Sequence, residues 1–522
     1  MFRIVRILLA IGLLVSLTFY FLDFNDLAPA ILSKLATIQL VPAILAGNAV
    51  IFGGLILVAF LFGRIYCSII CPLGILQDCI ARISKWFRPK KKNNYHYRRN
   101  NWVLRWTVLS LTVILFWLKF PLLTLLEPYS IFGRIITNVF QPIYLFGNNL
   151  LCSLFLSFGS YRFYYIDIVP VSWIVLSISL ISFGLIAVMA CFWGRLYCHS
   201  ICPVGTFFGF IARYSLFKIR IDSQKCIQCG LCSKVCKSSC INEKERTIDS
   251  SRCVDCFNCL TECRRKAISY SFFTKSGKKT ISNETKTNGS KNEVSVQTDE
   301  SKRTFLIALT TIAATSLPKT ASVVPHTKDE YGLIPFKREQ PISPPGSLSH
   351  ENLQQQCTAC HLCVSKCPSN VLKPALLEYG LQGLLQPRMD FEHGFCNYDC
   401  VVCSEVCPNK AITTLSKKEK HRVQPGHVVF IKENCIVHAK ETSCGACSEH
   451  CPTQAVAMVP YKDNLTIPLI NPDLCVGCGA CEYICPARPY RAIYVEGNTI
   501  HREAEIVQEE EKKIIDDIDF GF

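Results

Sequence analysis

The sequence is short of histidine and of acidic residues. It has 11 histidines in 522 residues, and its long apolar segments lack the paired histidines that would hold an embedded haem. Asp and Glu total 40 against 56 Lys and Arg, which gives a net charge of +16. This excess does not indicate nucleic-acid binding, because many basic residues lie in loops beside apolar segments, as in membrane proteins.

Cysteine is abundant by contrast. The chain has 32 cysteines, most of them in runs that approximate C-x2-C-x2-C-x3-C. Cysteine-dense chains are usually small secreted disulfide scaffolds, but this chain is long, and such close spacings rarely place Cα atoms at bridging distance. Zinc sites favour two separated pairs rather than runs of four ending before proline. The runs therefore predict cubane [4Fe–4S] clusters held by thiolates.

Apolar residues make up 50% of the chain and are concentrated before residue 200. Four segments approach the length of about 20 residues that a membrane-spanning helix needs. These segments are 4–22, 43–66, 102–122 and 171–193. Basic residues cluster at the amino terminus and in the loop 72–101, so both of these regions are expected to be cytoplasmic. The loops 23–42 and 123–170 have few basic residues and are expected to face outward. We therefore expect a four-helix transmembrane bundle within residues 1–215.

A motif is repeated at the ends of the second and fourth segments. The copies are FGRIYCSIICPLG (62–74) and WGRLYCHSICPVG (193–205). Each has two cysteines four residues apart, on one helical face, followed by a proline that disturbs the helix. The cysteines are Cys67, Cys71, Cys198 and Cys202. Either all four converge on one metal or redox site, which the duplication favours, or they are inert thiols beside snorkelling arginines.

Two regular runs follow the second copy of the motif. They are Cys226-Cys229-Cys232-Cys236 and Cys253-Cys256-Cys259-Cys263. In two-cluster ferredoxins the fourth cysteine of each run ligates the other run's cluster. We therefore expect Cys263 to complete the first ligand set and Cys236 the second. Lys237 and Arg264 stand where proline is usual, and the extra Cys240 could replace Cys236. Cys79, Cys152 and Cys191 lack any pattern and are expected to be ordinary apolar-site cysteines.

Four further runs lie near the carboxyl end. They are Cys357-Cys360-Cys363-Cys367, Cys396-Cys400-Cys403-Cys407, Cys435-Cys444-Cys447-Cys451 and Cys475-Cys478-Cys481-Cys485. Each ends in Cys-Pro, and the second and third have enlarged first spacings. Sixteen thiolates predict four clusters, which brings the expected total to six. Sequential pairing of the runs and nested pairing both fit the sequence, and the ligand residues are the same either way.

The segments between and after the runs complete the expected organisation. Residues after Ser301-Lys302-Arg303 resemble a twin-arginine export signal with a short apolar region, although a buried helix is an alternative. The expected domains are the membrane domain 1–215, a cytoplasmic two-cluster ferredoxin-like α+β domain 216–270, a flexible linker 271–300, a single apolar signal or anchor helix 301–324, a Pro-rich connector 325–348, a four-cluster polyferredoxin-like α+β domain 349–500, and an acidic, solvated tail 501–522.

These motifs and their order resemble two known kinds of protein. Residues 1–265 resemble the NapH-type quinol dehydrogenase membrane component, and 301–490 resemble the NapG/MauM ferredoxin-type proteins, which are usually separate chains. The resemblance implies a multi-pass protein of the bacterial inner membrane, with the first ferredoxin domain cytoplasmic and the second periplasmic. It also implies an electron carrier or quinol dehydrogenase component that serves a periplasmic nitrate or nitrous-oxide type reductase.

The partners implied are the quinone pool, a multihaem cytochrome and the reductase. On this interpretation electrons must cross the membrane between the two ferredoxin domains, through the motif cysteines and a quinone or through a cytochrome partner. An alternative function is a maturation or copper-reduction factor that uses Cys67, Cys71, Cys198 and Cys202. A redox sensor is a weaker alternative, because no DNA-binding or signalling segment is recognisable.

Overall fold

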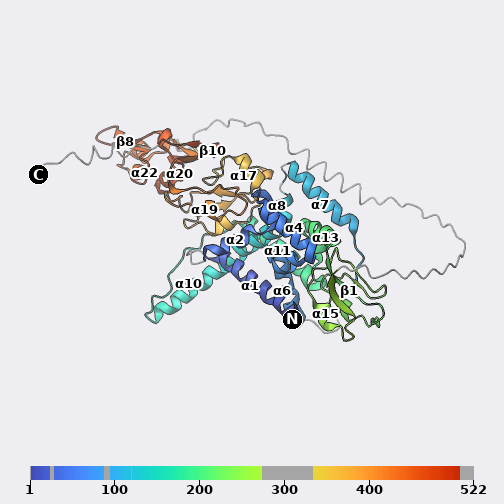
Figure 1. Cartoon of the computed structure of the whole chain (residues 1–522). Helices are drawn as coiled ribbons and strands as arrows, with labels where there is room; N and C mark the ends of the chain where they lie inside the picture. Colours follow the sequence, from blue (N-terminus) through green and yellow to red (C-terminus); the bar gives the residue numbers. More distant parts are fainter. Residues whose placement is uncertain are drawn as a thin grey trace, which may run out of the picture. The chain divides into compact units, whose positions relative to one another are not determined.

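The computed structural model describes residues 2–23, 29–87, 95–118, 120, 122–272 and 333–505 (Figure 1). The expected signal or anchor 301–324 lies outside the described residues, as do most of the linker 271–300 and of the tail 501–522. The chain divides into a compact unit, Met1–Phe273 with Lys337–Phe522, and a second unit, Thr274–Phe336. The amino-terminal helices and both ferredoxin regions therefore belong to one compact unit.

Helices make up most of the described part of residues 2–212. They are α1 (Phe2–Leu22), η1 (Ala30–Leu32), α2 (Ser33–Thr37), α3 (Leu40–Leu45), α4 (Ala49–Phe62), α5 (Ile65–Ile69), α6 (Pro72–Phe87), α7 (Trp102–Trp117), α8 (Leu122–Leu126), α9 (Pro128–Ile135), the π-helix η3 (Ile136–Phe140), α10 (Gln141–Ser157), α11 (Trp173–Trp193), α12 (Leu196–Ser200) and α13 (Pro203–Ala212). Three of the described helical stretches are long and apolar enough to cross a membrane: Phe2–Leu22, Pro128–Ser157 and Trp173–Trp193.

The helices differ from the expected bundle in two places. The expected spans 43–66 and 102–122 contain helices of only 14 and 16 residues, about 21–24 Å long at 1.5 Å per residue. A bilayer core is about 30 Å thick. The long stretch Pro128–Ser157 lies in the segment 123–170 that we expected to be an outward loop. Polar residues and Pro142 obscure its apolar character, and the proline is tolerated at the start of α10.

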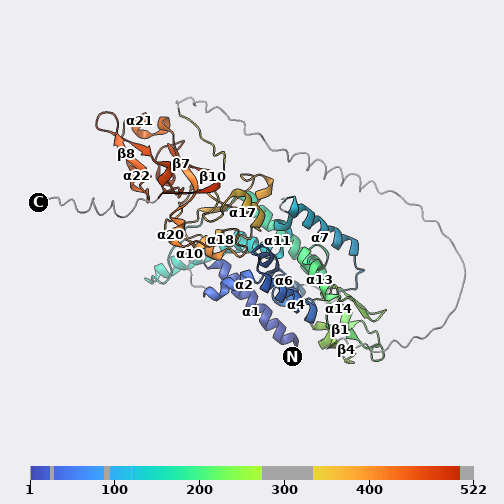
Figure 2. The same ribbon diagram turned by 45° about the horizontal axis from the view of Figure 1, so that its top comes forward.

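The first ferredoxin module, residues 217–272, is small and mixed. Its elements are β1 (Phe217–Ile221), α14 (Leu231–Lys234), β2 (Ile241–Asn242), β3 (Thr247–Ile248), α15 (Asn258–Glu262) and β4 (Ile268–Phe272). β1 pairs antiparallel with β4, with Ile219 opposite Tyr270, and β2 pairs with β3. Figure 2 shows β1 and β4 next to α14. The short helices follow the cysteine loops, so the sheet and the loops share one small core.

The second ferredoxin module, residues 337–505, is larger and built on the same plan. Its elements are α17 (His350–Gln356), α18 (Leu362–Ser365), β5 (Leu372–Pro374), η4 (Leu381–Gly383), β6 (Pro387–Met389), α19 (Val402–Val406), α20 (Lys417–Lys420), β7 (Val423–Phe430), η5 (Lys432–Asn434), α21 (Ile436–Lys440), α22 (Ala446–Glu449), β8 (Val456–Pro460), β9 (Thr466–Ile470), η6 (Pro472–Leu474), α23 (Ala480–Ile484) and β10 (Ile493–Glu503). Three antiparallel pairs, β5–β6, β7–β10 and β8–β9, hold it together.

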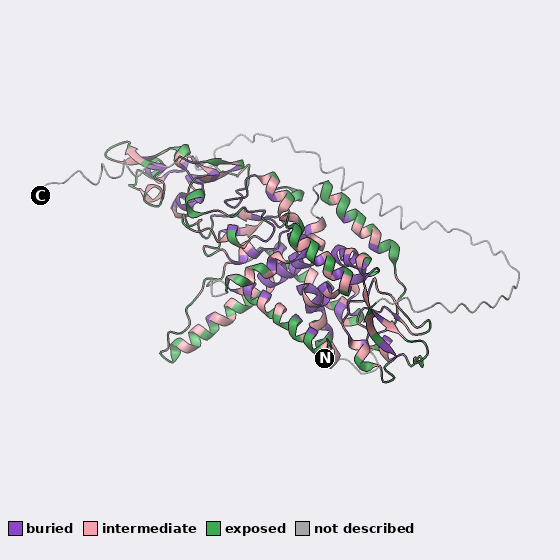
Figure 3. Ribbon diagram, viewed as in Figure 1, coloured by how far each residue is buried: buried purple, intermediate pink, exposed green. Residues whose placement is uncertain are grey.

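One hydrophobic core joins the helices to both modules. Its buried members include residues of α1, α5, α9 and α12, together with Val254 of the first module and Cys360 of the second. By contrast, α10 is mostly exposed, with Asn149 its one buried residue among those described (Figure 3). The core therefore lies where the repeated motifs, the amino-terminal helix and the two ferredoxin modules meet.

Candidate iron–sulfur sites and a buried four-thiol core

The first module gathers its cysteines into the two predicted sets. We call Cys226, Cys229, Cys232 and Cys263 set 1, and Cys236, Cys253, Cys256 and Cys259 set 2. The thiols of set 1 line one cavity of about 240 Å³. Left-handed backbone at Gln228 and Gly230 turns the loop around this cavity. The fourth cysteine of the second run thus lies with the first three of the first run, as a two-cluster ferredoxin requires.

Set 2 has a fifth thiol beside it. The charges of Cys236 and Cys253 both act on Cys256 and on Cys259. Cys240 Sγ lies 3.5 Å from Cys236 Sγ and is buried. The Cys240 thiol holds the pKa of Cys236 at about 7 through this hydrogen bond, which acts against burial. Of these two thiols Cys236 is the easier to ionise, as a ligand must be.

The second module pairs its runs sequentially. Burial and then the charges of Cys360, Cys357 and Cys407 raise the pKa of Cys363. Burial and then the charges of Cys396 and Cys367 raise the pKa of Cys403. The first two runs therefore form set 3 (Cys357, Cys360, Cys363, Cys407) and set 4 (Cys367, Cys396, Cys400, Cys403).

The last two runs exchange their fourth cysteines in the same manner. Cys447 lies within electrostatic reach of Cys444, Cys485 and Cys435, and Cys481 of Cys478, Cys475 and Cys451. They form set 5 (Cys435, Cys444, Cys447, Cys485) and set 6 (Cys451, Cys475, Cys478, Cys481). Nested pairing of the four runs, which the sequence left open, does not describe this arrangement.

The sets follow one another in a line. Cys232 of set 1 lies within electrostatic reach of Cys259 of set 2, and Cys403 of set 4 lies within electrostatic reach of Cys363 of set 3. Sets 4 and 6 meet where the Cys396 N–H donates to the Cys478 carbonyl at 2.9 Å. Sets 5 and 6 share a hydrophobic core. The second module thus orders its sets 3, 4, 6 and 5, beginning at the amino-terminal helices.

The cysteine sets fit polynuclear clusters better than single ions. In the described ranges, no three His, Cys, Asp or Glu side chains are placed to hold one metal ion. A cubane takes one thiolate at each of four corners, so its ligands stand farther apart than those of a mononuclear site. The cavity enclosed by set 1 has room between its thiols. The residues present therefore fit [4Fe–4S] groups.

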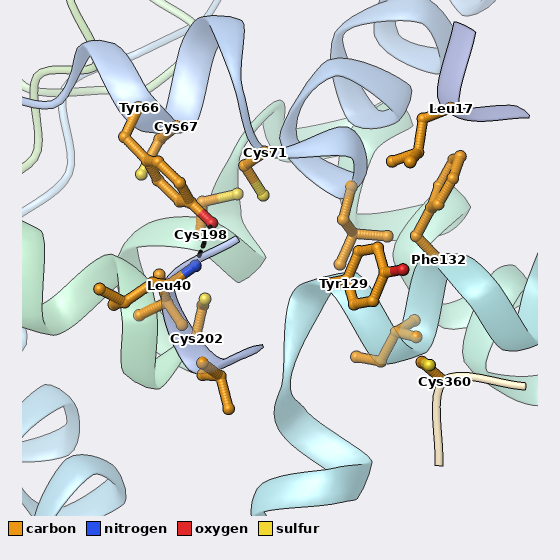
Figure 4. Close-up of a cluster of buried hydrophobic side chains, with 14 of the residues drawn as sticks. Leu17, Leu40, Tyr66, Cys67, Cys71, Tyr129, Phe132, Cys198, Cys202 and Cys360 are labelled. Atoms are coloured by element: carbon orange, nitrogen blue, oxygen red, sulfur yellow. Dashed lines mark hydrogen bonds between the residues drawn. The ribbon is translucent and has the colours of Figure 1, made fainter. Parts of the chain in front are cut away.

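The four motif cysteines meet in one place, which we call the four-thiol core (Figure 4). Each is 3–4% exposed, and all lie in the hydrophobic core. The charges of Cys198, Cys67 and Cys71 act on Cys202. The two motif copies are therefore brought face to face, as the duplication predicted.

Two arginines tie the copies together reciprocally. The Arg64 guanidinium donates to the Cys198 carbonyl at 3.0 Å, and the Arg195 guanidinium donates to the Cys67 carbonyl at 2.6 Å. Both arginines are at most 1% exposed. Each motif thus supplies the clamp for the first cysteine of the other motif, and this gives the core an approximate twofold symmetry.

The second cysteine of each motif lies at the start of a helix. Cys202 is the N-cap of α13, and its Sγ accepts from the Gly205 N–H at 3.3 Å. Gly74 donates to Cys71 in the same way. Helix amino termini stabilise negative charge, so these N–H groups offset part of the rise in the pKa of Cys71 and Cys202 that burial causes. A Cβ on Gly74 or Gly205 would overlap the carbonyl oxygen of Cys67 or Cys198, respectively.

The first module contacts this core through both motifs. The Arg64 N–H donates to Asp255 Oδ2 at 3.0 Å, and the Arg195 N–H donates to the Lys237 carbonyl at 3.0 Å. Asp255 lies next to Cys256 and Lys237 next to Cys236, both of set 2. Set 2 is therefore the set that lies against the four-thiol core.

Asp78 of α6 forms a buried charge centre at this contact. Its carboxylate pairs with Arg195 at 2.9 Å, Lys237 at 3.2 Å and Arg6 at 3.4 Å. Burial alone would raise the pKa of Asp78, but Arg195, Lys237 and Arg6 hold it below the usual range. One carboxylate thus joins the second motif, the first module and the amino-terminal helix.

The second module contacts the opposite end of α1 and the helix α9. Lys366 pairs with Asp23 at 2.6 Å, with side chains 4% and 2% exposed. Arg134 of α9 donates to the Ala359 carbonyl at 3.2 Å. His361 accepts from Asn138 at 3.2 Å and donates to the Leu385 carbonyl at 2.9 Å. These contacts all involve the loop and helix that carry the first run, so set 3 lies nearest the helices.

Two buried residues lie between the four-thiol core and set 3. The Glu127 carboxylate lies within electrostatic reach of both the Cys71 thiol and the Cys360 thiol. Tyr129 is fully buried and lies within electrostatic reach of Cys360 and Cys407. Figure 4 shows the Tyr129 ring between the thiol group and Cys360. With set 2 on the other side, the core thus lies between the two modules.

A cavity of about 300 Å³ lies beside set 3. Cys357, Thr358 and the amides of Gln354, Gln355 and Gln382 line it, together with apolar residues of α3, α7 and α8. It shares Leu45, Phe116 and Leu123 with a second cavity of about 240 Å³, lined almost wholly by apolar side chains. The two form a path from an apolar helix surface to polar groups near Cys357.

Several contact residues were not predicted from the sequence. Asp78, Glu127 and Asn138 are single polar residues in apolar or amphipathic segments, and only their isolation there marked them. His361 also has no distinguishing signal in the sequence; it is 1% exposed, and burial and then the charge of Arg134 lower its pKa to about 3. A neutral histidine between two hydrogen-bond partners is a docking residue.

Two family models match parts of the chain. A 4Fe-4S binding domain matches residues 46–94 and 177–222, and a 4Fe-4S dicluster domain matches residues 440–488. The first matches both copies of the repeated motif. The second contains all of set 6 and most of set 5.

The chain is also similar to curated ferredoxin-type proteins. Ferredoxin-type protein NapF of Escherichia coli (strain K12) is 25% identical over 162 residues, which are 31% of this chain and 90% of that protein. Methylamine utilization ferredoxin-type protein MauN of Methylobacillus flagellatus is 28% identical over 219 residues, 41% of this chain and 62% of that protein. Ferredoxin-type protein NapG of Escherichia coli (strain K12) is 27% identical over 154 residues, which are 28% of this chain and 65% of that protein. These matches confirm the predicted resemblance to ferredoxin-type proteins of the Nap and Mau systems.

Proposed function

We propose that this relative of the Nap and Mau ferredoxin-type proteins takes electrons from membrane quinol and passes them towards a periplasmic reductase of nitrate or nitrous-oxide type. The observation that carries the proposal is the unbroken order of thiols. Sets 1 and 2, the four-thiol core, and sets 3, 4, 6 and 5 follow one another within one compact unit. Cubane clusters, when bound by these sets, supply one-electron carriers.

The proposed placement puts the first module in the cytoplasm and the second in the periplasm. The two modules contact opposite ends of α1: Arg3 donates to Thr261 of the first module at 3.1 Å, and Asp23 pairs with Lys366 of the second. The basic loop 72–101 adjoins the first module, where Tyr95 donates to the Lys234 carbonyl at 3.0 Å. Positive loops stay in the cytoplasm, which supports this orientation.

Quinol would enter at the cavities beside set 3. The apolar cavity suits an isoprenoid tail, and the adjoining cavity offers amide groups for two quinol hydroxyls. Gln354, Gln355 and Gln382 can hold the headgroup through hydrogen bonds. Cys357 lines the same cavity, so electrons would enter at set 3. From set 3 the order of sets 4, 6 and 5 leads to the acceptor, and the four-thiol core leads to sets 2 and 1.

The protein's own part in this function is to bury and orient the ligands. Burial raises the pKa of Cys357. This thiol therefore stays protonated unless a bound metal stabilises the thiolate. Tyr129 and the surrounding apolar side chains exclude water between the core and set 3. Arg134 and His361 fix the loop that carries Cys360 against α9 and η3.

The test is reduction of the purified, cluster-loaded protein by a reduced short-chain ubiquinone analogue. The visible iron–sulfur absorbance should bleach. Leu123→Trp, which obstructs the junction of the two cavities, should slow the bleaching tenfold or more, whereas Leu111→Trp on α7, outside both cavities, should not. Bleaching by dithionite with none by quinol would contradict the proposal.

The alternative, a copper-reduction or maturation factor, predicts a different outcome. It needs the motif cysteines to receive and release a cargo metal. Each of the four thiols is at most 4% exposed and lies beneath set 2, which supports a resident role instead. Cuprous ion taken up by the cluster-loaded protein and released to a chelator, with quinol inert, would favour the alternative.

A further inference from the structure

We propose that Cys67, Cys71, Cys198 and Cys202 together hold one further iron–sulfur cluster, shared between the two copies of the motif. It would be the redox centre that joins the two ferredoxin modules. The inference rests on the proposed function for its purpose, but not for its evidence, which is the construction of the four-thiol core.

The two motif copies form one site rather than two. Each copy supplies only two convergent thiols, and an iron–sulfur cluster of two or four irons takes four. The arginine of each copy clamps the cysteine carbonyl of the other, at 3.0 and 2.6 Å. Neither matched segment, 46–94 or 177–222, can therefore complete a ligand set alone. Together they supply the four thiolates of one cluster.

The surroundings of the four thiols compensate negative charge. Arg64 Nη2 lies 3.7 Å from Cys67 Sγ. The thiols of Cys71 and Cys202 accept backbone N–H groups at the first turns of α6 and α13. Burying anionic groups in an apolar core is costly unless such partners are present. These partners offset part of the cost of burying thiolates, which metal ligation requires.

Buried donors near the thiols lack acceptors. Within the described ranges, Gln77 Nε2, Arg195 Nη2 and Arg64 Nε have no hydrogen-bond partner, although each side chain is at most 1% exposed. Gln77 is beside the core, because its Oε1 accepts from Cys198 Sγ at 3.6 Å. An unpaired buried donor costs about 1–3 kcal/mol. The bridging sulfides of a cluster would give these donors the acceptors they lack.

The four thiols are available to a metal group, because all four cysteines are free of disulfides. The cysteines of sets 1 to 6 share this property. A single zinc or copper ion is the other occupant that four thiolates can take, and metal analysis separates it from an iron–sulfur cluster.

The step that this site performs is a single-electron relay. The site gains one electron from a reduced neighbour, which is thereby oxidised, and gives one electron to the next oxidised neighbour. No bond is formed or broken and no proton moves, so the four thiolates stay in place. Set 2 on one side and set 3 on the other are the neighbours.

The first measurement needs no variant. Iron, acid-labile sulfide and cysteine would be determined on the protein loaded with clusters in vitro. Iron and sulfide in excess of what six cubanes hold would be expected. An amount that six cubanes fully account for would overturn the proposal, and so would stoichiometric zinc or copper in the core.

The second measurement compares Cys67→Ser/Cys71→Ser with a matched control, Cys152→Ser/Cys191→Ser. The first variant should lose one cluster's iron and sulfide and one component of the Mössbauer spectrum, and the control should lose neither. Iron and spectrum unchanged in the first variant would overturn the proposal. Because these readouts do not involve quinol, a protein that holds the extra iron but ignores quinol would refute the proposed function alone.

Gln77→Leu keeps the assay informative if the double variant does not fold. This variant retains all thiols, so its iron content should match wild type. It removes a donor to the cluster, so the electron paramagnetic resonance signal of one reduced centre should shift. Signals identical to wild type would contradict the assignment of Gln77 to the cluster.

Discussion

The two ferredoxin modules contact the same helical core through different parts of the same cysteine motif. The first module uses Lys237, the residue after a fourth cysteine, where the second module has proline. The second module uses His361 and Lys366, which lie inside its first run. The departure from proline in the first module is therefore a docking feature. A cluster motif leaves several positions free for contacts, and each module has used different ones.

The contacts also differ in electrostatic design. At the first module one carboxylate, that of Asp78, forms ion pairs with three cations. At the second module one buried pair, Lys366 with Asp23, stands beside a hydrogen bond from the Arg134 guanidinium to a carbonyl and one from Asn138 to the neutral His361. Removing the shared carboxylate should therefore do more damage than removing one member of the single pair.

The largest expected effect is that of Asp78→Asn. It leaves Arg195, Lys237 and Arg6 buried without their shared counter-charge, and removing one partner of a buried ion pair costs about 3–5 kcal/mol. Thermal unfolding of the detergent-solubilised protein would measure the loss. Asp222→Asn, which removes an exposed pair with Lys225, should change stability by less than about 1 kcal/mol. Equal effects of the two would contradict the proposed charge centre.

Lys366→Met should loosen the second module. Asp23 would be left buried without its cation, at a cost of about 3 kcal/mol, the lower end for a buried pair, and the loop of set 3 should exchange amide hydrogens faster. Lys373→Met, which affects a more exposed pair with Asp390, is the control. Unchanged exchange at residues 357–367 would show that this ion pair does not fix the module.

Gly74→Ala and Gly205→Ala test the tight packing inside each motif copy. A methyl group at either position would meet the carbonyl of the first cysteine of the same copy, Cys67 or Cys198, which the arginine of the other copy also contacts. Overpacking of this kind costs about 1–3 kcal/mol. Gly54→Ala in α4, where a methyl group meets nothing within 4 Å, should be neutral or stabilising by up to about 1 kcal/mol. Stability assays that rank the three variants equally would contradict this packing of the motif.

The smallest expected effect separates two neighbouring thiols of the first module. Cys240→Ser should leave the iron content unchanged and alter the spectrum only slightly, because Cys236 is the thiol with the lower pKa. Cys236→Ser should lose or convert the cluster of set 2. The reverse ranking in iron analysis would make Cys240 the ligand.

How much of this could be predicted from the sequence depended on the range of the signal. Local spacing marked every cysteine run and the repeated motif, and motif order identified the related proteins. The pairing of the second module's runs depends on which loops lie side by side, so spacing alone left it open. The contact of Lys366 with Asp23, 343 positions away, has no local signal.

The membrane helices show the same limit. Trp173–Trp193 has no charged residue, and in Phe2–Leu22 the charged residues Arg3 and Arg6 lie near the start; both segments were predicted as spans. In Pro128–Ser157, Arg134 and Asn138 are polar because they hold the second module. Docking residues thus lowered the apolar signal of the helix that carries them.

The most direct test of the central claim is electron transfer across a sealed membrane. Cluster-loaded protein would be inserted in lipid vesicles that contain ferricyanide, and dithionite would be added outside. The proposed line of thiols predicts that the trapped ferricyanide is reduced by the wild-type protein and by Cys152→Ser/Cys191→Ser, and at least tenfold more slowly by Cys67→Ser/Cys71→Ser. Ferricyanide that stays oxidised in wild-type vesicles, while the clusters facing the dithionite are fully reduced, would contradict a continuous path.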